Sequence, residues 1–219
     1  MVIENPYKTL YENQSKLKEL YFKQSFDTVS LITYCVDKST IRAFHSSKGY
    51  VKTYKPLSIF RVWAFNFLTD KKNIDLLKSK ENFKKTRGKV LKNLENYWVS
   101  IDGGKPEFYQ FNKLIDLFFK CLPLWINLDI KTKNWIFDNT NVPLDKFSLN
   151  LLRRMNSKIN IPKNVSMNFI DSKNYDKLQK EIKDKCRDIP AIVFDLYAWD
   201  ESHRPKESFE LIKLEKKKK

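Results

Sequence analysis

Three short segments of the chain combine ionisable and aromatic residues in ways that could do chemistry. The first is a Gly-Gly turn followed by a helical pattern with Lys113 near its start, and the second, Asn-Val-Pro-Leu-Asp, brings Asp145 to the start of another. The third, Ala-Ile-Val-Phe-Asp-Leu-Tyr-Ala-Trp, holds Asp195 and Trp199 four positions apart. An uncharged amine is a nucleophile, a carboxylate stabilises developing positive charge, and an indole stacks on flat rings. An acid in so apolar a stretch must be buried, paired or functional.

The order and spacing of these segments resemble the helix-hairpin-helix (HhH-GPD) DNA glycosylase superfamily. Within it they are most similar to the archaeal 8-oxoguanine DNA glycosylase (AGOG) branch and its OGG-like bacterial relatives. In that branch a lysine opens the helix after the hairpin, a catalytic aspartate follows in a Pro-hydrophobic-Asp turn, and an Ile-Pro…Asp…Trp segment contributes to the base pocket. Here Asp145 stands 32 positions after Lys113, and Lys120 stands seven positions after Lys113. The resemblance extends over about residues 100–200.

The resemblance implies a DNA N-glycosylase with AP-lyase activity that excises an oxidised or otherwise modified base, with 8-oxoguanine as the first candidate. Lys113 would attack C1′ of the sugar and form a Schiff base, which requires a pKa lowered by desolvation or by neighbouring cations such as Lys120. Asp145 would stabilise the oxocarbenium-like transition state. Asp195 would hydrogen-bond the edge of an extruded base, and Trp199 would stack on it.

Further residues complete the site that the resemblance implies. Phe118 stands next to the position where the archaeal branch tends to place an aromatic residue against the base, and Trp63 is a candidate second wall of the pocket. Backbone N–H groups and a positive charge in the Gly-Gly turn would bind a DNA phosphate. The residues of this turn are Gly103, Gly104 and Lys105.

Most of these residues also have a structural interpretation. Lys113 could be a surface lysine or an ion-pair partner of Asp116. Asp145 has the position of a helix N-cap; in the superfamily that the sequence resembles, this role can coincide with catalysis. Trp63 is more typical of a hydrophobic core, to which Trp199 could also belong.

Composition excludes several other classes of protein. The 219-residue chain carries 42 Lys and Arg against 26 Asp and Glu, a net charge of +16, which favours nucleic acid as the partner. A solvated, lysine-rich surface would give the same excess. Three scattered cysteines and two histidines do not form the pattern of a zinc site, an iron–sulfur cluster or a disulfide framework.

We therefore expect a protein without metal or other cofactor that acts on double-stranded DNA as a monomer. No apolar run reaches the ~18 residues of a membrane span, and the N-terminal residues lack a secretory apolar segment. These features predict a soluble, intracellular protein with no membrane partner. In a bacterium or archaeon it would be cytoplasmic and associated with the nucleoid.

The sequence predicts an all-α fold, because glycines are few and apolar residues recur every three or four positions. The β-branched segment 28–36 could be a strand, but we expect a buried helix. The resemblance implies a helical bundle in two lobes, with the active site between them. The first lobe is residues 1–99, and the second, residues 100–214, contains the hairpin-like turn, the catalytic helix and the base-pocket helices. Residues 215–219 form a basic tail. Helical patterns lie at Leu10–Tyr21, Phe60–Leu68, Val90–Trp98, Leu114–Leu122, Phe147–Leu152, Tyr175–Cys186 and Ala191–Trp199.

Two other functions stay open at this point. A non-catalytic helical protein could bind DNA or RNA through a basic face. Alternatively, the same glycosylase chemistry could act on phage-type modified bases in defence. Catalysis, unlike simple binding, requires Lys113 and Asp145 to converge in a pocket that Trp199 also lines.

Overall fold

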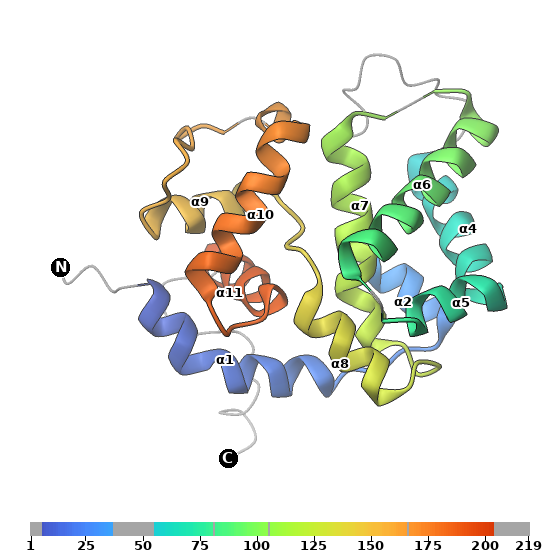
Figure 1. The fold of residues 1–219 in the computed structure, drawn as a ribbon, viewed down its shortest axis with the longest axis horizontal. Coiled ribbons are helices and arrows are strands. Elements are labelled where there is room, and N and C mark those ends of the chain that lie inside the picture. The colour runs from blue at the N-terminus through green and yellow to red at the C-terminus, as the bar shows by residue number, and fades with distance from the viewer. Residues whose placement is uncertain (1–5, 37–54, 81, 105, 166, 204–219) are drawn as a thin grey trace. The chain divides into compact units, whose positions relative to one another are not determined.

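A computed structural model describes residues 6–36, 55–80, 82–104, 106–165 and 167–203. Helices and their connections account for these residues, and no β-strand occurs among them (Figure 1). The all-α class expected from the sequence is therefore confirmed. The chain divides into two compact units. We call residues 1–24 together with 141–219 the terminal unit, and residues 25–140 the central unit.

The terminal unit is built around its last helix. Its helices are α1 (Pro6–Phe22), α9 (Lys146–Arg154), α10 (Ser172–Cys186) and α11 (Ala191–His203), with a short 3-10 helix, η3 (Met167–Phe169). Helix α11 packs against α1, α9 and α10, so it is the element that joins this unit together. The fully buried side chains of the terminal unit include Leu10, Leu149, Leu152, Leu178, Ile182, Ile192 and Phe194.

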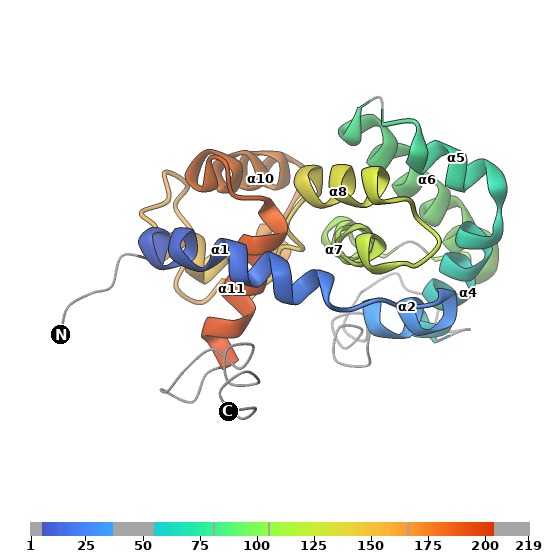
Figure 2. The same cartoon turned by 90° about the horizontal axis from the view of Figure 1, so that it is seen from below.

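The central unit packs around two helices, α4 and α7. Its elements are α2 (Thr28–Cys35), α4 (Pro56–Thr69), α5 (Lys71–Lys78), α6 (Phe83–Asp102), α7 (Phe108–Cys121), η2 (Leu122–Leu124) and α8 (Ile130–Asn139). Helix α4 packs against α2, α5 and α6, while α7 packs against α2, α6 and α8. Figure 2 shows α4, α5 and α6 together on one side of this unit.

Aromatic rings form the core of the central unit. The ring centroid of Phe118 lies 5.1 Å from that of Trp63, 5.6 Å from Phe67 and 6.4 Å from Phe60. Its neighbour Phe119 packs edge-on against it at 6.2 Å. These edge-to-face arrangements are among those that aromatic pairs favour.

Local capping explains why the ambiguous segment 28–36 is helical. Asp27 is the N-cap of α2, and its Oδ1 accepts a hydrogen bond of 2.8 Å from the N–H of Ser30. Such a cap satisfies one of the donors that a helix start otherwise leaves without a partner. The helix expected here is confirmed, but only one face of it is buried: residues 31, 32 and 35 face the core, whereas residues 29, 30, 33 and 34 are exposed.

The division of the chain in the structure differs from the boundary that we expected between residues 99 and 100. Helix α6 continues through this point to Asp102, and Gly103 ends it in a left-handed conformation with φ of 69°. The Gly-Gly turn is thus a connection between α6 and α7 inside the central unit. The chain passes from one unit to the other at residues 24–25 and 140–141 instead.

Candidate functional site

The segment that leads to Asp145 is held by one face of α10. The backbone N–H of Val142 donates to Oε1 of Gln179 at 3.0 Å, and Nε2 of Gln179 donates to the Val142 carbonyl at 2.7 Å. Nδ2 of Asn141 donates to the Tyr175 hydroxyl at 3.0 Å. Gln179 therefore pairs with this extended segment as a neighbouring strand would, and it fixes where the following helix α9 begins.

Asp145 is the N-cap of α9, and one of its carboxylate oxygens performs this role. Oδ1 accepts hydrogen bonds from the N–H groups of Phe147, at 2.8 Å, and Ser148, at 3.0 Å. The Asp145 N–H donates to Oγ of Ser148 at 2.9 Å, which completes a capping box. Oδ2 accepts no hydrogen bond from the described residues. The half-buried carboxylate therefore keeps one oxygen available after the helix start is satisfied.

The aspartate caps of this chain differ in whether the second carboxylate oxygen is used. In Asp27 and Asp129, Oδ2 accepts a hydrogen bond from the hydroxyl three positions later, at 2.9 and 2.7 Å, so both oxygens are used. Asp171, the cap of α10, resembles Asp145, since its Oδ1 accepts the N–H groups two and three positions later, at 3.0 and 2.8 Å. Asp171 is exposed, whereas Asp145 is half-buried. Asp171 is thus a matched reference for the capping role of Asp145.

Helix α11 carries the two other candidate residues of the terminal unit, Asp195 and Trp199. It packs directly against α9, the helix that Asp145 caps. Asp195 is 7% exposed and has an interaction partner inside the protein, as expected for an acid in an apolar stretch. Trp199 is 51% exposed, so it is not a core residue and part of its side chain is open to solvent.

Lys113 lies in the second turn of α7, in the central unit. Its side chain is half-buried, and no described residue forms an ion pair or side-chain hydrogen bond with it. The ion pair with Asp116 that the sequence allowed does not form. Asp116 instead accepts a hydrogen bond of 2.7 Å from Nε of Arg87. The amine is therefore not committed to an acidic partner among the described residues.

A buried polar network fixes the turn of α7 that carries Lys113. Nη2 of Arg87 donates to Oδ1 of Asn112 at 2.8 Å, in addition to the contact of its Nε with Asp116. Asn112 in turn donates to the Phe108 carbonyl at 2.9 Å. Arg87 thus joins α6 to the residues on both sides of Lys113. Removing one member of a buried ion pair costs about 3–5 kcal/mol, because the other charge is then left buried without a partner.

The Gly-Gly turn does not present its backbone as we expected. The N–H of Gly103 donates to the Val99 carbonyl at 2.9 Å, because Gly103 is the C-cap of α6. This N–H is therefore not available to a phosphate. Gly104 is buried, and Lys105 lies outside the described residues.

The two remaining candidates for the base pocket are core residues of the central unit. Phe118 is 2% exposed and contacts aromatic rings on several sides, so its position does not support stacking on a base. Trp63 is 1% exposed, and its Nε1 donates to Oδ1 of Asn93 at 2.8 Å. The core interpretation of Trp63 is confirmed, although the edge of its ring reaches a pocket described below.

The cysteines are not candidates for the nucleophile. Cys35, Cys121 and Cys186 are all buried as free thiols. Burial raises the pKa of the Cys35 thiol well above its usual range, with a contribution from contact with Cys121. Burial also raises the pKa of the Cys186 thiol to about 12. Since the thiolate is the reactive form, Cys35 and Cys186 are unreactive at neutral pH.

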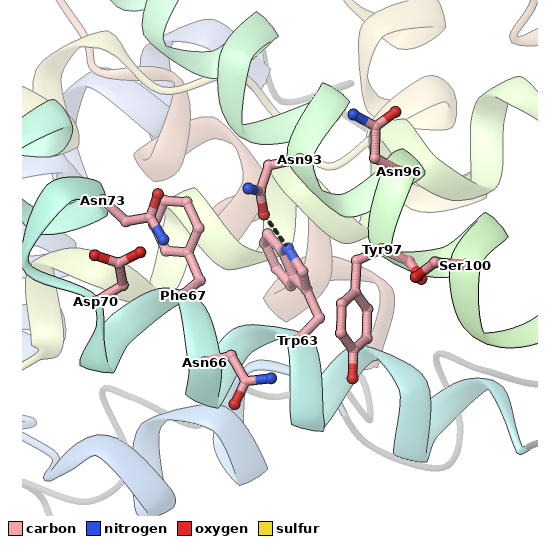
Figure 3. A pocket seen from close by; sticks show the side chains of 9 residues that line it. All are labelled: Trp63, Asn66, Phe67, Asp70, Asn73, Asn93, Asn96, Tyr97 and Ser100. Atoms are coloured by element: carbon pink, nitrogen blue, oxygen red, sulfur yellow. Dashed lines mark hydrogen bonds between the residues drawn. The ribbon is translucent and has the colours of Figure 1, made fainter.

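The central unit also contains a pocket that the sequence analysis missed. Its volume is about 400 Å³, within the range of small-molecule sites. The signal was the recurrence of asparagine on three helical segments, where asparagine is not a favoured residue. The lining residues are Trp63, Asn66, Phe67, Asp70, Asn73, Asn93, Asn96, Tyr97 and Ser100 (Figure 3).

Comparison of the chain with family models, curated proteins and solved structures finds no match. In the part of the chain that the structure describes, no three His, Cys, Asp or Glu side chains are grouped so that they could hold a metal ion. None of the described helices is long and apolar enough to cross a membrane. The functional interpretation rests on the sequence resemblance and on the local geometry of the residues above.

Proposed function

We propose that the protein is a DNA N-glycosylase with AP-lyase activity that acts on double-stranded DNA. Its substrate is an oxidised or otherwise modified base, with 8-oxoguanine as the first candidate. The observation that carries the proposal is the carboxylate of Asp145. It caps α9 through Oδ1 alone and keeps Oδ2 available, at the position that the sequence resemblance assigns to a catalytic aspartate.

Each candidate residue has a defined chemical role in the proposed reaction. Trp199 stacks on the extruded base and Asp195 reads its edge. The bond between the base and C1′ breaks, the electron pair leaves with the base, and Asp145 stabilises the positive charge that develops on the sugar. The amine of Lys113 bonds to C1′, and opening of the sugar ring gives a Schiff base. Loss of a C2′ proton then expels the 3′-phosphate.

The charge of the chain supports DNA as the partner, but it does not distinguish catalysis from binding. A net charge of +16 predicts an affinity for duplex DNA that falls steeply with salt concentration, because bound phosphates release their counterions. A non-catalytic DNA- or RNA-binding protein would show the same dependence. The chemistry of the complex must therefore be measured.

Borohydride trapping on a panel of duplexes tests the proposal. Each duplex carries one lesion, and the panel includes oxidised bases, phage-type modified bases and an abasic site. Borohydride reduces a Schiff base to a stable amine, so we expect a covalent protein–DNA complex with the favoured lesion, and strand cleavage without borohydride. Binding to every duplex with neither trapping nor cleavage would instead favour the non-catalytic alternative.

Substitutions on α11 should separate base recognition from sugar chemistry. Base stacking is worth ~1–3 kcal/mol, so Trp199→Ala should reduce excision of the favoured lesion roughly 5- to 150-fold. Asp195→Asn should instead reduce the discrimination between that lesion and its unmodified parent base. Cleavage at a preformed abasic site needs no base and should persist in both variants. The measurement is single-turnover excision and abasic-site cleavage on matched duplexes.

Tyr11 provides the control for the tryptophan substitution. It is another exposed aromatic residue of the terminal unit, at 56% exposure, and Tyr11→Ala should leave excision unchanged. A fall in abasic-site cleavage that parallels the fall in excision for Trp199→Ala would contradict the stacking role.

A further inference from the structure

The pocket of the central unit lies between three helical segments that are distant from Asp195 and Trp199 in the sequence. Helix α4 and Asp70, the residue that follows it, form one wall, Asn73 of α5 borders it, and α6 forms the opposite wall (Figure 3). Helix α4 packs against both α5 and α6. The pocket is therefore built by the packing of one unit.

The lining of this pocket is polar but almost uncharged. Four side-chain amides and the hydroxyls of Tyr97 and Ser100 offer donors and acceptors, and Asp70 is the single charged group. No lysine or arginine lines it, although the chain contains 42 of them. Such a lining does not select a phosphate. It selects a neutral ligand with several donors and acceptors.

Two of the polar groups are fixed by contacts that leave ligand-binding atoms available. The indole N–H of Trp63 is a donor only, so its 2.8 Å contact identifies the oxygen of Asn93 and leaves the amide nitrogen to donate to a ligand. Oδ1 of Asp70 accepts the N–H of Lys72 at 2.8 Å as the cap of α5, while Oδ2 can accept from a ligand. The pocket thus presents an oriented donor and an oriented acceptor.

Exposed lysines stand next to the lining residues in the sequence. Lys71 and Lys72 directly follow Asp70 at the start of α5. Lys92, whose Nζ lies 3.8 Å from Oε2 of Glu95, directly precedes Asn93 on α6. Lys89 lies one helical turn before Asn93. An uncharged pocket on helices that carry such lysines fits a base whose own backbone phosphates remain outside the pocket.

We propose that this pocket binds one unpaired base of a polynucleotide. Adenine is the best match, because a side-chain amide pairs with its N6 donor and N7 acceptor at the same time. This site is separate from the one proposed around Asp195 and Trp199. It does not depend on Lys113, and it would also serve a protein that binds nucleic acid without cleaving it.

Equilibrium binding to two short oligomers tests the proposal. One consists only of tetrahydrofuran abasic analogues, which have no C1′ aldehyde and cannot form a Schiff base with a lysine. The other is identical except that it carries a single adenine, so both have the same number of phosphates. We expect the wild-type protein to bind the adenine oligomer about tenfold more tightly. The double variant Asn66→Ala/Asn96→Ala should lose this preference without a change in net charge, and should still excise lesions from duplex DNA.

The control is the double variant Asn134→Ala/Asn139→Ala, which removes two exposed asparagines of α8 in the same unit. It should keep the preference for adenine. Equal binding of the two oligomers by the wild-type protein, or a preference that survives in Asn66→Ala/Asn96→Ala, would overturn the proposal. Free adenosine that binds as tightly as the adenine oligomer would also overturn it, since the pocket would then serve a small metabolite.

Discussion

Lys113→Gln is expected to abolish borohydride trapping and strand cleavage on lesion and abasic duplexes. Glutamine keeps most of the length and polarity of the side chain but has no nucleophilic amine, so the Schiff base cannot form. Affinity for undamaged duplex should stay within about twofold of wild type, because one charge is a small share of the net +16. Trapping gels and equilibrium binding measure the two quantities.

A second lysine makes this result specific. Lys133 on α8 is also half-buried and belongs to the same unit, so Lys133→Gln changes the net charge equally. It should trap and cleave like the wild-type protein. Trapping that persists in Lys113→Gln would contradict the assignment of the nucleophile, and Lys120, seven positions later on α7, would be the next candidate.

Asp145→Asn should fold normally but excise the lesion on the order of 10²-fold more slowly, or worse. Asparagine is a good N-cap, so its side-chain oxygen can accept the N–H groups of Phe147 and Ser148 as Oδ1 of aspartate does. What it lacks is the negative charge that stabilises the sugar in the transition state. Thermal unfolding therefore measures the capping role of Asp145, and single-turnover excision measures its catalytic role.

Asp171→Asn is the matched control, since Asp171 caps α10 through the same pair of hydrogen bonds. We expect this variant to change neither the melting temperature nor the excision rate substantially. Equal excision rates for Asp145→Asn and wild type would leave Asp145 with the capping role alone.

Helices with a continuous apolar face were predictable from the sequence, and shorter polar helices were not. The pattern around Leu114–Leu122 identified α7, and Pro123 marked the turn that follows it. Helices α5 and α8 were missed because few of their side chains are buried. Leu77 is the one buried residue of α5. Such helices depend on their caps and on packing by neighbours more than on periodicity.

The local features of the candidate site were predictable, whereas its long-range contacts were not. Pro-x-Asp before a helical pattern indicated the cap at Asp145. Nothing in the sequence pairs Arg87 with Asp116, or Gln179 with Val142, because 29 and 37 positions separate these partners. Periodicity assigns a residue to a face of its own helix, but it does not say which neighbouring helix covers that face.

The sequence also did not show which aromatic residues are buried. Phe118 and Trp199 both lie on helices rich in apolar residues, yet the structure buries the first and exposes half of the second. Their difference arises from the other helices of each unit. The amide-lined pocket likewise depends on how α4, α5 and α6 pack, so its residues could not be grouped in advance.

Mapping the borohydride adduct on the wild-type protein tests the central claim most directly. A lysine that carries reduced sugar is not cut by trypsin, and Lys105 precedes a proline. The account therefore predicts the adduct in one peptide, residues 93–120, with the added mass on Lys113. An adduct mapped to a lysine outside α7, or no adduct on any lesion or abasic duplex that the protein binds, would contradict it.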